Sequence, residues 1–131
     1  MVLVIDTRFL IAHTLPSSEN ERILIKGFTK KLAQEEIIIP SIVIVEFLKV
    51  VGSVIGKDSV RIRLRLWIGG GAKIIPIDEE VAFLAGEIAL AHKNLPLADA
   101  IIGAIARKFS GKIISDDPHF GTLDIKTIWY K

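Results

Sequence analysis

Short apolar runs alternate along the chain with longer segments of helical periodicity, and this alternation constrains the fold more than any other feature of the sequence. The runs are rich in Ile and Val and almost continuously apolar, as is typical of strands covered on both faces. Strands are expected at Val2–Ile5, Ile37–Ile39, Lys73–Ile77, Lys112–Ser115 and Thr127–Tyr130. Single strands separated by helices favour βαβ units, so we predict an α/β fold with a parallel sheet.

Helical patterns fill the segments between these strands. Helices are expected at Thr7–His13, Ser18–Gln34, Ser41–Ile55, Glu79–Lys93 and Leu97–Phe109. Pro40 and Pro96 stand directly before two of them, where a missing N–H costs little. The segment Val60–Ile68 is ambiguous, because V-R-I-R-L-R-L-W-I alternates like a strand whereas Leu and Arg are good helix formers.

The composition excludes several classes of protein. The 131 residues contain no cysteine, which removes disulfides, thiolate zinc sites and cysteine nucleophiles and fits a cytoplasmic protein. No apolar run is long enough to span a membrane, and the opening M-V-L-V-I-D indicates a first strand rather than a signal peptide. No linker, repeat or low-complexity stretch divides the sequence, so a single domain over residues 1–131 is expected. The net charge of +2 and the pI near 9.0 permit a nucleic-acid partner without requiring one.

Four acidic residues follow apolar runs or lie near the start of an expected helix: Asp6, Glu46, Asp99 and Asp117. In right-handed βαβ units the strands end, and the next helices begin, at the same edge of the sheet. The four side chains are therefore expected at the carboxyl edge, where open α/β sheets bind ligands. Carboxylates that converge without matching Lys or Arg repel one another unless a divalent cation lies among them.

For any one of these acids, a role as a helix N-terminal or turn residue explains its position better than catalysis does. For the four acids considered together this explanation is weaker, because Glu46 and Asp99 lie among apolar neighbours where an unpaired charge is energetically unfavourable. A turn explains Asp116 and a helix N-cap explains Asp78.

Other catalytic motifs are missing or incomplete. Ser115 has no G-x-S-x-G elbow around it, and no phosphate-binding glycine motif is present. His13, His92 and His119 have no zinc-ligand spacing and are read as surface or locally hydrogen-bonded residues. His119 alone is close enough in sequence to Asp117 to contact a substrate.

The order of motifs resembles the PIN-domain nucleases, and most closely the VapC toxins of toxin–antitoxin pairs. The resemblance rests on V-I-D-T at 4–7, I-P-S-I-V-I-V-E at 39–46, L-A-D-A-I-I-G-A-I-A at 97–106 and S-D-D-P-H-F at 115–120. It spans essentially the whole chain. Each motif is weak by itself, whereas the ordered set is fairly specific.

The resemblance implies a three-layer α/β/α fold with a five-stranded parallel sheet in the order 3-2-1-4-5. It also implies Mg²⁺- or Mn²⁺-dependent endonucleolytic cleavage of RNA, usually single-stranded. In-line attack by metal-bound water should leave 5′-phosphate and 3′-hydroxyl ends. Asp6 and Asp99 would be the main metal ligands, and Glu46 and Asp117 would complete the metal shell or orient the attacking water. Thr7 and Ser115 occupy the places of hydroxyl residues that support the acids. The implied partners are an RNA substrate, a second copy of the chain and a VapB-like antitoxin that presents an Arg to the acids.

Three features depart from the family pattern. Arg8 stands where a small polar residue is more common, and the Asp116–Asp117 doublet leaves the fourth acid to be chosen, with S-x-D-x-x-F spacing favouring Asp117. The family also places a helix across Val60–Ile68, which we adopt. A PIN nuclease of RNA processing and a non-catalytic PIN-like module that binds RNA or protein remain alternatives to the toxin.

Overall fold

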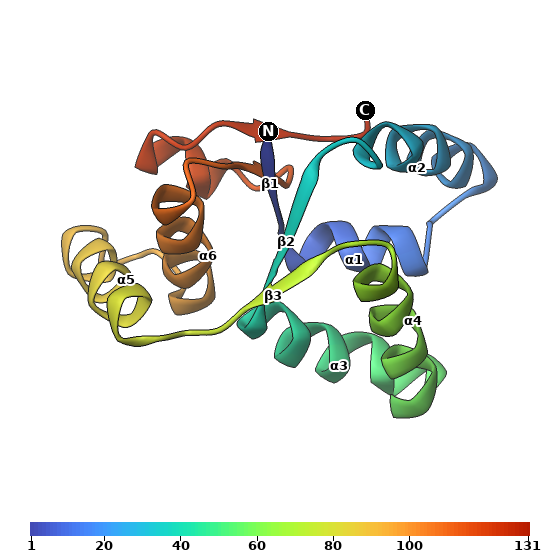
Figure 1. Cartoon of the computed structure of the whole chain (residues 1–131), viewed down its shortest axis with the longest axis horizontal. Helices are drawn as coiled ribbons and strands as arrows, with labels where there is room; N and C mark the ends of the chain where they lie inside the picture. The colour runs from blue at the N-terminus through green and yellow to red at the C-terminus, as the bar shows by residue number, and fades with distance from the viewer.

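A computed structural model describes all 131 residues and shows a five-stranded parallel sheet in the order β3-β2-β1-β4-β5 (Figure 1). The strands are β1 (Val2–Ile5), β2 (Glu36–Pro40), β3 (Lys73–Ile75), β4 (Lys112–Ile114) and β5 (Thr127–Ile128). All neighbouring strands pair in parallel. The predicted α/β class, strand order and strand direction are confirmed.

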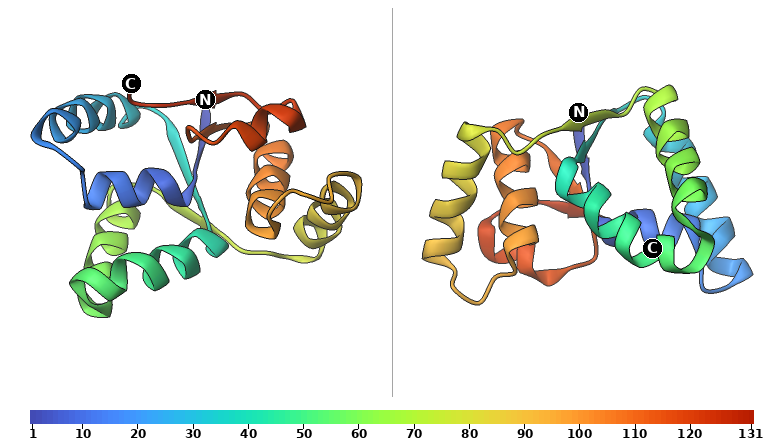
Figure 2. Two further views of the ribbon diagram at one scale, coloured as in Figure 1. Left: turned by 180° about the vertical axis from the view of Figure 1, so that it is seen from behind. Right: turned by 90° about the horizontal axis from the view of Figure 1, so that it is seen from below.

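Six α-helices and one 3₁₀-helix connect the strands. They are α1 (Thr7–Thr14), α2 (Glu19–Leu32), α3 (Ser41–Ile55), α4 (Lys57–Gly69), α5 (Glu79–Ala91), α6 (Leu97–Lys108) and the 3₁₀-helix η1 (Pro118–Leu123). Helices α1 to α4 lie on one side of the sheet, and the α5–α6 pair covers the other side (Figures 1 and 2). The chain changes side when it passes from edge strand β3 to β4, next to β1, which places a switch point between β1 and β4.

The core lies on both faces of the central strands. Ile5, Ile38 and Ile113 are almost completely buried, as the continuous apolar runs predicted. Phe9 of α1, Phe47 of α3 and Phe120 of η1 are the largest fully buried side chains. They belong with the strands to one apolar cluster, so the helices that carry the acidic residues are fixed by packing. No helix is both long and apolar enough to cross a bilayer.

The ambiguous segment Val60–Ile68 is helical and forms most of α4. Its alternation suggested a strand, but Val60 and Leu64, four residues apart, are the two buried side chains of this helix. Helix α4 packs against α3, and the two are joined at Gly56, whose φ of +88° favours glycine. The helix adopted from the family resemblance is confirmed, and packing against α3 overrides the local alternation.

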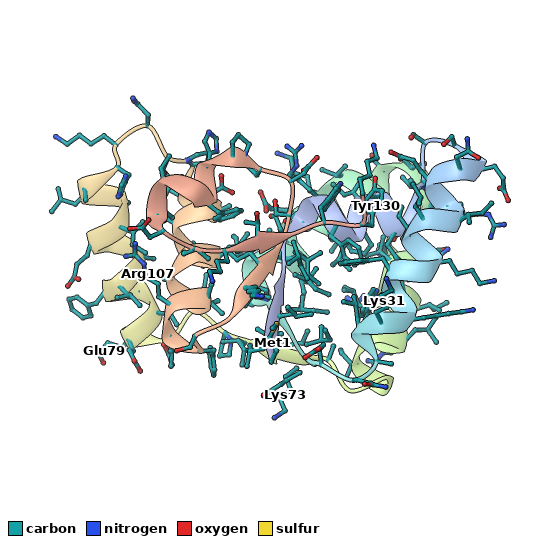
Figure 3. The ribbon with its side chains drawn as sticks, turned by 90° about the horizontal axis from the view of Figure 1, so that it is seen from above. Met1, Lys31, Lys73, Glu79, Arg107 and Tyr130 are labelled. Carbon is teal, nitrogen blue, oxygen red and sulfur yellow. The ribbon has the colours of Figure 1, made fainter.

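Several expected elements are longer than those observed. Strand β3 ends at Ile75 instead of Ile77, because Pro76 has no N–H to continue the ladder. Strand β5 ends at Ile128 instead of Tyr130. The chain beyond it runs toward α2, and Tyr130 lies near that helix (Figure 3). There Lys131 Nζ lies 2.7 Å from a carboxylate oxygen of Glu21. Helices α2 and α5 each end two residues early, at Leu32 and Ala91.

Candidate active site

The strand register brings Asp6 beside Ser115. Ile5 of β1 pairs with Ile114 of β4, so the residues that follow these strands are neighbours at the carboxyl edge of the sheet. The backbone N–H of Asp6 donates to the carbonyl oxygen of Ile114 at 3.4 Å, and the Ser115 hydroxyl donates to Asp6 Oδ2 at 2.6 Å. Asp6 is 3% and Ser115 1% exposed, so this carboxylate is held in one orientation in the interior.

Two further acids reach this edge from helices. Asp99 lies in the first turn of α6, which begins after Pro96, and it is buried. Glu46 lies in the second turn of α3, where its Oε1 accepts a hydrogen bond from the Thr7 hydroxyl at 2.6 Å. Thr7 and Ser115 thus each hold one acid, as the resemblance implied.

Asp117 enters the site through the turn after β4. Its backbone N–H donates to Ser115 Oγ at 3.0 Å, and its Oδ1 accepts from the backbone N–H of His119 at 2.9 Å, so that it caps η1. Arg107 of α6, labelled in Figure 3, donates to the carbonyl oxygen of Leu123 at 2.9 Å and so ties the C-terminal end of η1 to α6. The neighbouring Asp116 is exposed and bonds to Arg8, whereas Asp117 is the member of the doublet whose charge acts on Asp6 and Asp99.

His119 is the residue whose place in the site the sequence did not reveal. Its Nδ1 lies 3.0 Å from Asp99 Oδ2 and 3.2 Å from Asp117 Oδ1. One donor atom from each of these three side chains lies within 4.8 Å of the other two. The only sequence signal was the D-x-H spacing of Asp117 and His119, since the contact with Asp99 depends on how η1 packs against α6.

The electrostatics of the cluster are unfavourable without a counter-charge. Burial raises the pKa of Asp6 to about 6; the negative charges of Asp99 and Asp117 add to the rise, and the Ser115 hydrogen bond opposes it. Burial also raises the pKa of Asp99, with further repulsion from Asp117 and Glu46, whereas His119 acts in the opposite direction. The four acids therefore interact with one another across the site, although they come from four separate parts of the chain.

The remaining predicted polar residues have structural positions or lie elsewhere. Asp78 caps α5 by accepting from the backbone N–H of Val81 at 2.9 Å, as expected. His13 differs from the expectation of a surface or locally hydrogen-bonded residue. Its Nδ1 is buried without a hydrogen-bond partner, in a cavity away from the acids, and burial lowers its pKa. His92 is half-buried at the C-terminus of α5 and has no side-chain hydrogen bond.

A model of the PIN domain family matches residues 3–126, which is nearly the whole chain. The chain belongs to the PIN-domain family. No curated protein matches the sequence.

Solved structures with the same fold include toxins of toxin–antitoxin pairs. VapBC2 from Rickettsia felis, solved bound to a promoter DNA fragment, is 15% identical, with full coverage of both chains and a TM-score of 0.77. FitAcB from Neisseria gonorrhoeae is 23% identical, covering 98% of this chain and 96% of the other, with a TM-score of 0.73. VapC20 of Mycobacterium tuberculosis, a toxin that cleaves the sarcin–ricin loop, is 16% identical, covering 94% and 95%, with a TM-score of 0.73. At these identities the similarity shows a shared fold.

The donor set of this PIN domain fits a hard divalent cation. Carboxylate oxygens are the ligands that Mg²⁺ and Mn²⁺ prefer, and Asp99, Asp117 and His119 already bring their donor atoms together. A cation among them would offset the burial and the mutual repulsion that together raise the pKa of Asp6 and Asp99. The fold therefore carries a possible acidic metal site at its carboxyl edge.

Proposed function

We propose that this PIN domain is a metal-dependent endoribonuclease that hydrolyses phosphodiester bonds of single-stranded RNA, and that it is the toxin of a VapBC-type pair. The observation that supports this most is the meeting of Asp6, Glu46, Asp99 and Asp117 from four elements at one edge of the sheet, two of them with raised pKa. A stable domain gains nothing from burying acids that repel one another, so a ligand of opposite charge is the simplest reason for the arrangement.

The side chains divide the proposed work between them. Asp6 and Asp99 are the buried carboxylates and would hold Mg²⁺ or Mn²⁺, while Glu46 and Asp117 would complete the shell or orient the attacking water. A bound divalent cation supplies charge neutralisation at the scissile phosphate and acidifies water. Ser115 keeps Asp6 in one rotamer through its 2.6 Å hydrogen bond, so the ligand oxygens are oriented before the cation arrives.

Cleavage of labelled single-stranded RNA by the purified protein tests this proposal. Cutting should require Mg²⁺ or Mn²⁺, stop when EDTA is added and leave 5′-phosphate and 3′-hydroxyl ends. Products with a 2′,3′-cyclic phosphate, or cutting that continues in EDTA, would point to a metal-independent contaminant instead.

An antitoxin partner is proposed on two grounds. The structural relative from Klebsiella pneumoniae was solved as a toxin–antitoxin complex, and the one from Rickettsia felis as VapBC2 on promoter DNA. This chain also has a cavity of about 340 Å³ between α1, α2 and α4, lined by both polar and apolar side chains, among them His13, Leu32, Leu66 and Trp67. Leu66 is 69% exposed at this cavity, as expected of a surface that an apolar segment of a partner covers. The same antitoxin would present an Arg to the four acids and displace the cation.

Leu66→Glu should prevent capture of the antitoxin. A charge introduced at this contact should weaken binding of the antitoxin at least about tenfold. The fold should survive because the side chain is exposed. Leu90→Glu is the matched control, since Leu90 is 73% exposed on α5 and lies outside the cavity. Co-purification with the small protein encoded immediately upstream measures the effect. If the wild-type nuclease purifies alone and fully active from that co-expression, an RNA-processing enzyme replaces the toxin.

A homodimer is proposed through the outer face of α3 and α4. These two segments carry more apolar side chains than two helices on the outside of a sheet are expected to bury: Val50, Val51, Val54, Ile62, Leu64, Leu66, Trp67 and Ile68. Val51 and Leu64 are in fact buried, whereas Val54 and Ile62 are 65% and 62% exposed. Exposed apolar side chains on neighbouring helices suit a two-fold contact. Light scattering that gives a monomer at all concentrations would contradict it.

A further inference from the structure

Arg8 is a positive charge at the mouth of the acidic cluster. It lies in the first turn of α1, two residues after Asp6, and its Nε donates to Asp116 Oδ1 at 2.6 Å. The two residues are 108 positions apart, and their side chains are 54% and 40% exposed. Because Arg8 follows Asp6 by two residues and its partner Asp116 directly precedes Asp117, this ion pair places the guanidinium next to the proposed metal ligands.

The guanidinium has unused hydrogen-bonding capacity. A guanidinium has five N–H donors, and in Arg8 only Nε is bonded to the protein, so both terminal nitrogens remain for an acceptor. The other nitrogen donor beside the acids, His119, already has its Nδ1 within 3.0 Å of Asp99 and 3.2 Å of Asp117. The four carboxylates repel the phosphates of an approaching RNA strand. The planar guanidinium of Arg can donate two parallel N–H bonds to a phosphate, so Arg8 is well suited to bind one at the entrance of the site.

We propose that Arg8 binds a phosphate of the RNA backbone at the entrance of the site, and that Asp116 holds the guanidinium in place until the phosphate competes for it. This inference rests on the proposed nuclease function and adds a substrate-positioning residue to it. Arg8 replaces a small polar residue that is more common in PIN domains, so the contact is a property of this chain and not of the four-acid site.

A purely structural role for the ion pair makes a different prediction. If Arg8 and Asp116 only fasten α1 to the turn after β4, removing either partner should have the same effect, a small loss of stability. If Arg8 binds phosphate, the two substitutions should act on RNA binding in opposite directions. Arg8→Gln removes the donor, whereas Asp116→Asn removes its competitor.

The experiment measures binding of a short fluorescein-labelled single-stranded RNA across a salt series. All proteins carry Asp99→Asn, which blocks cutting, and all are measured in the same Mg²⁺ buffer. Arg8→Gln should weaken binding about tenfold, the loss of a charged hydrogen bond, and flatten the slope of log K against log salt by about 0.7. Asp116→Asn should tighten binding by a factor of about two to five, the energy of one exposed ion pair. In the Arg8→Gln background Asp116→Asn should change nothing, which excludes a general effect of removing a negative charge.

Arg22→Gln is the matched control. Arg22 forms an exposed ion pair with Glu19 at 2.6 Å on α2, and Glu19 is the only charged group that raises its pKa, so Arg22 does not interact with the acidic site. Equal losses of RNA binding in Arg8→Gln and Arg22→Gln would overturn the inference. It would also be overturned if Arg8→Gln and Asp116→Asn both lowered RNA binding together with the melting temperature. Absence of metal-dependent RNA cutting by the protein with Asp99 intact would instead overturn the proposed function, and the inference with it.

Discussion

Asp99→Asn is expected to abolish RNA cleavage by this protein. Asp99 is buried in the first turn of α6 and brings its Oδ2 close to donor atoms of Asp117 and His119. A neutral amide binds a hard divalent cation poorly, and charge stabilisation by such a cation is worth several kcal/mol in the transition state. The rate of cutting should therefore fall by about a thousandfold or more. Gel analysis of labelled single-stranded RNA with Mg²⁺ or Mn²⁺ measures the loss.

Asp58→Asn is the control for this substitution. Asp58 is exposed, lies in the first turn of α4 and forms no ion pair, so the change is chemically identical but is placed on a helix that carries none of the four acids. It should cut RNA at the wild-type rate. Equal activity of wild type, Asp58→Asn and Asp99→Asn would mean that the cutting comes from another nuclease, and the proposed site would have to be abandoned.

Asp6→Asn is expected to stabilise the metal-free protein at neutral pH. The folded-state pKa of Asp6, about 6, is above the ordinary value of 3.8, so the folded state binds the proton more tightly than the unfolded state. The free energy of unfolding of the wild type should therefore fall as pH rises from about 4 to about 6, and the loss is complete above that window. The rise in the pKa of Asp6 from 3.8 to about 6 corresponds to about 3 kcal/mol of unfolding free energy. Asp6→Asn removes this contribution, and its amide oxygen still accepts from Ser115.

Urea unfolding of both proteins in EDTA, at several pH values between 4 and 7, measures this difference. The stability of Asp6→Asn relative to wild type should increase with pH across that window, because every other titrating group is shared. Mg²⁺ should reverse the order by stabilising wild type more than the variant, since a ligand that binds only the folded state adds to its stability. A variant that is less stable than wild type in EDTA at every pH would make Asp6 a structural residue.

Patterns of residues close together in the chain were sufficient to predict the fold class and the edge of the sheet at which the acids lie. The alternation of buried strands with amphipathic helices specified an α/β fold, and parallel βαβ units place the ends of all strands at one edge. Asp6 and Asp117 could be assigned to that edge because each follows a central strand by one to three residues. Asp99 and Glu46 could be assigned because each lies within two turns of a helix start. The strand order itself came from the family resemblance.

The contacts within the site were decided only by the tertiary structure. The pairing of Arg8 with Asp116 spans 108 residues, and the contact of His119 with Asp99 depends on the packing of η1 on α6. The same is true of α4, where burial of Val60 and Leu64 against α3 overrode a strand-like alternation. Sequence periodicity shows which side of a helix or strand is apolar, and it therefore predicts where each helix and strand lies in the chain. It does not report the distance between side chains of different elements, which is set by how the packed core brings those elements together.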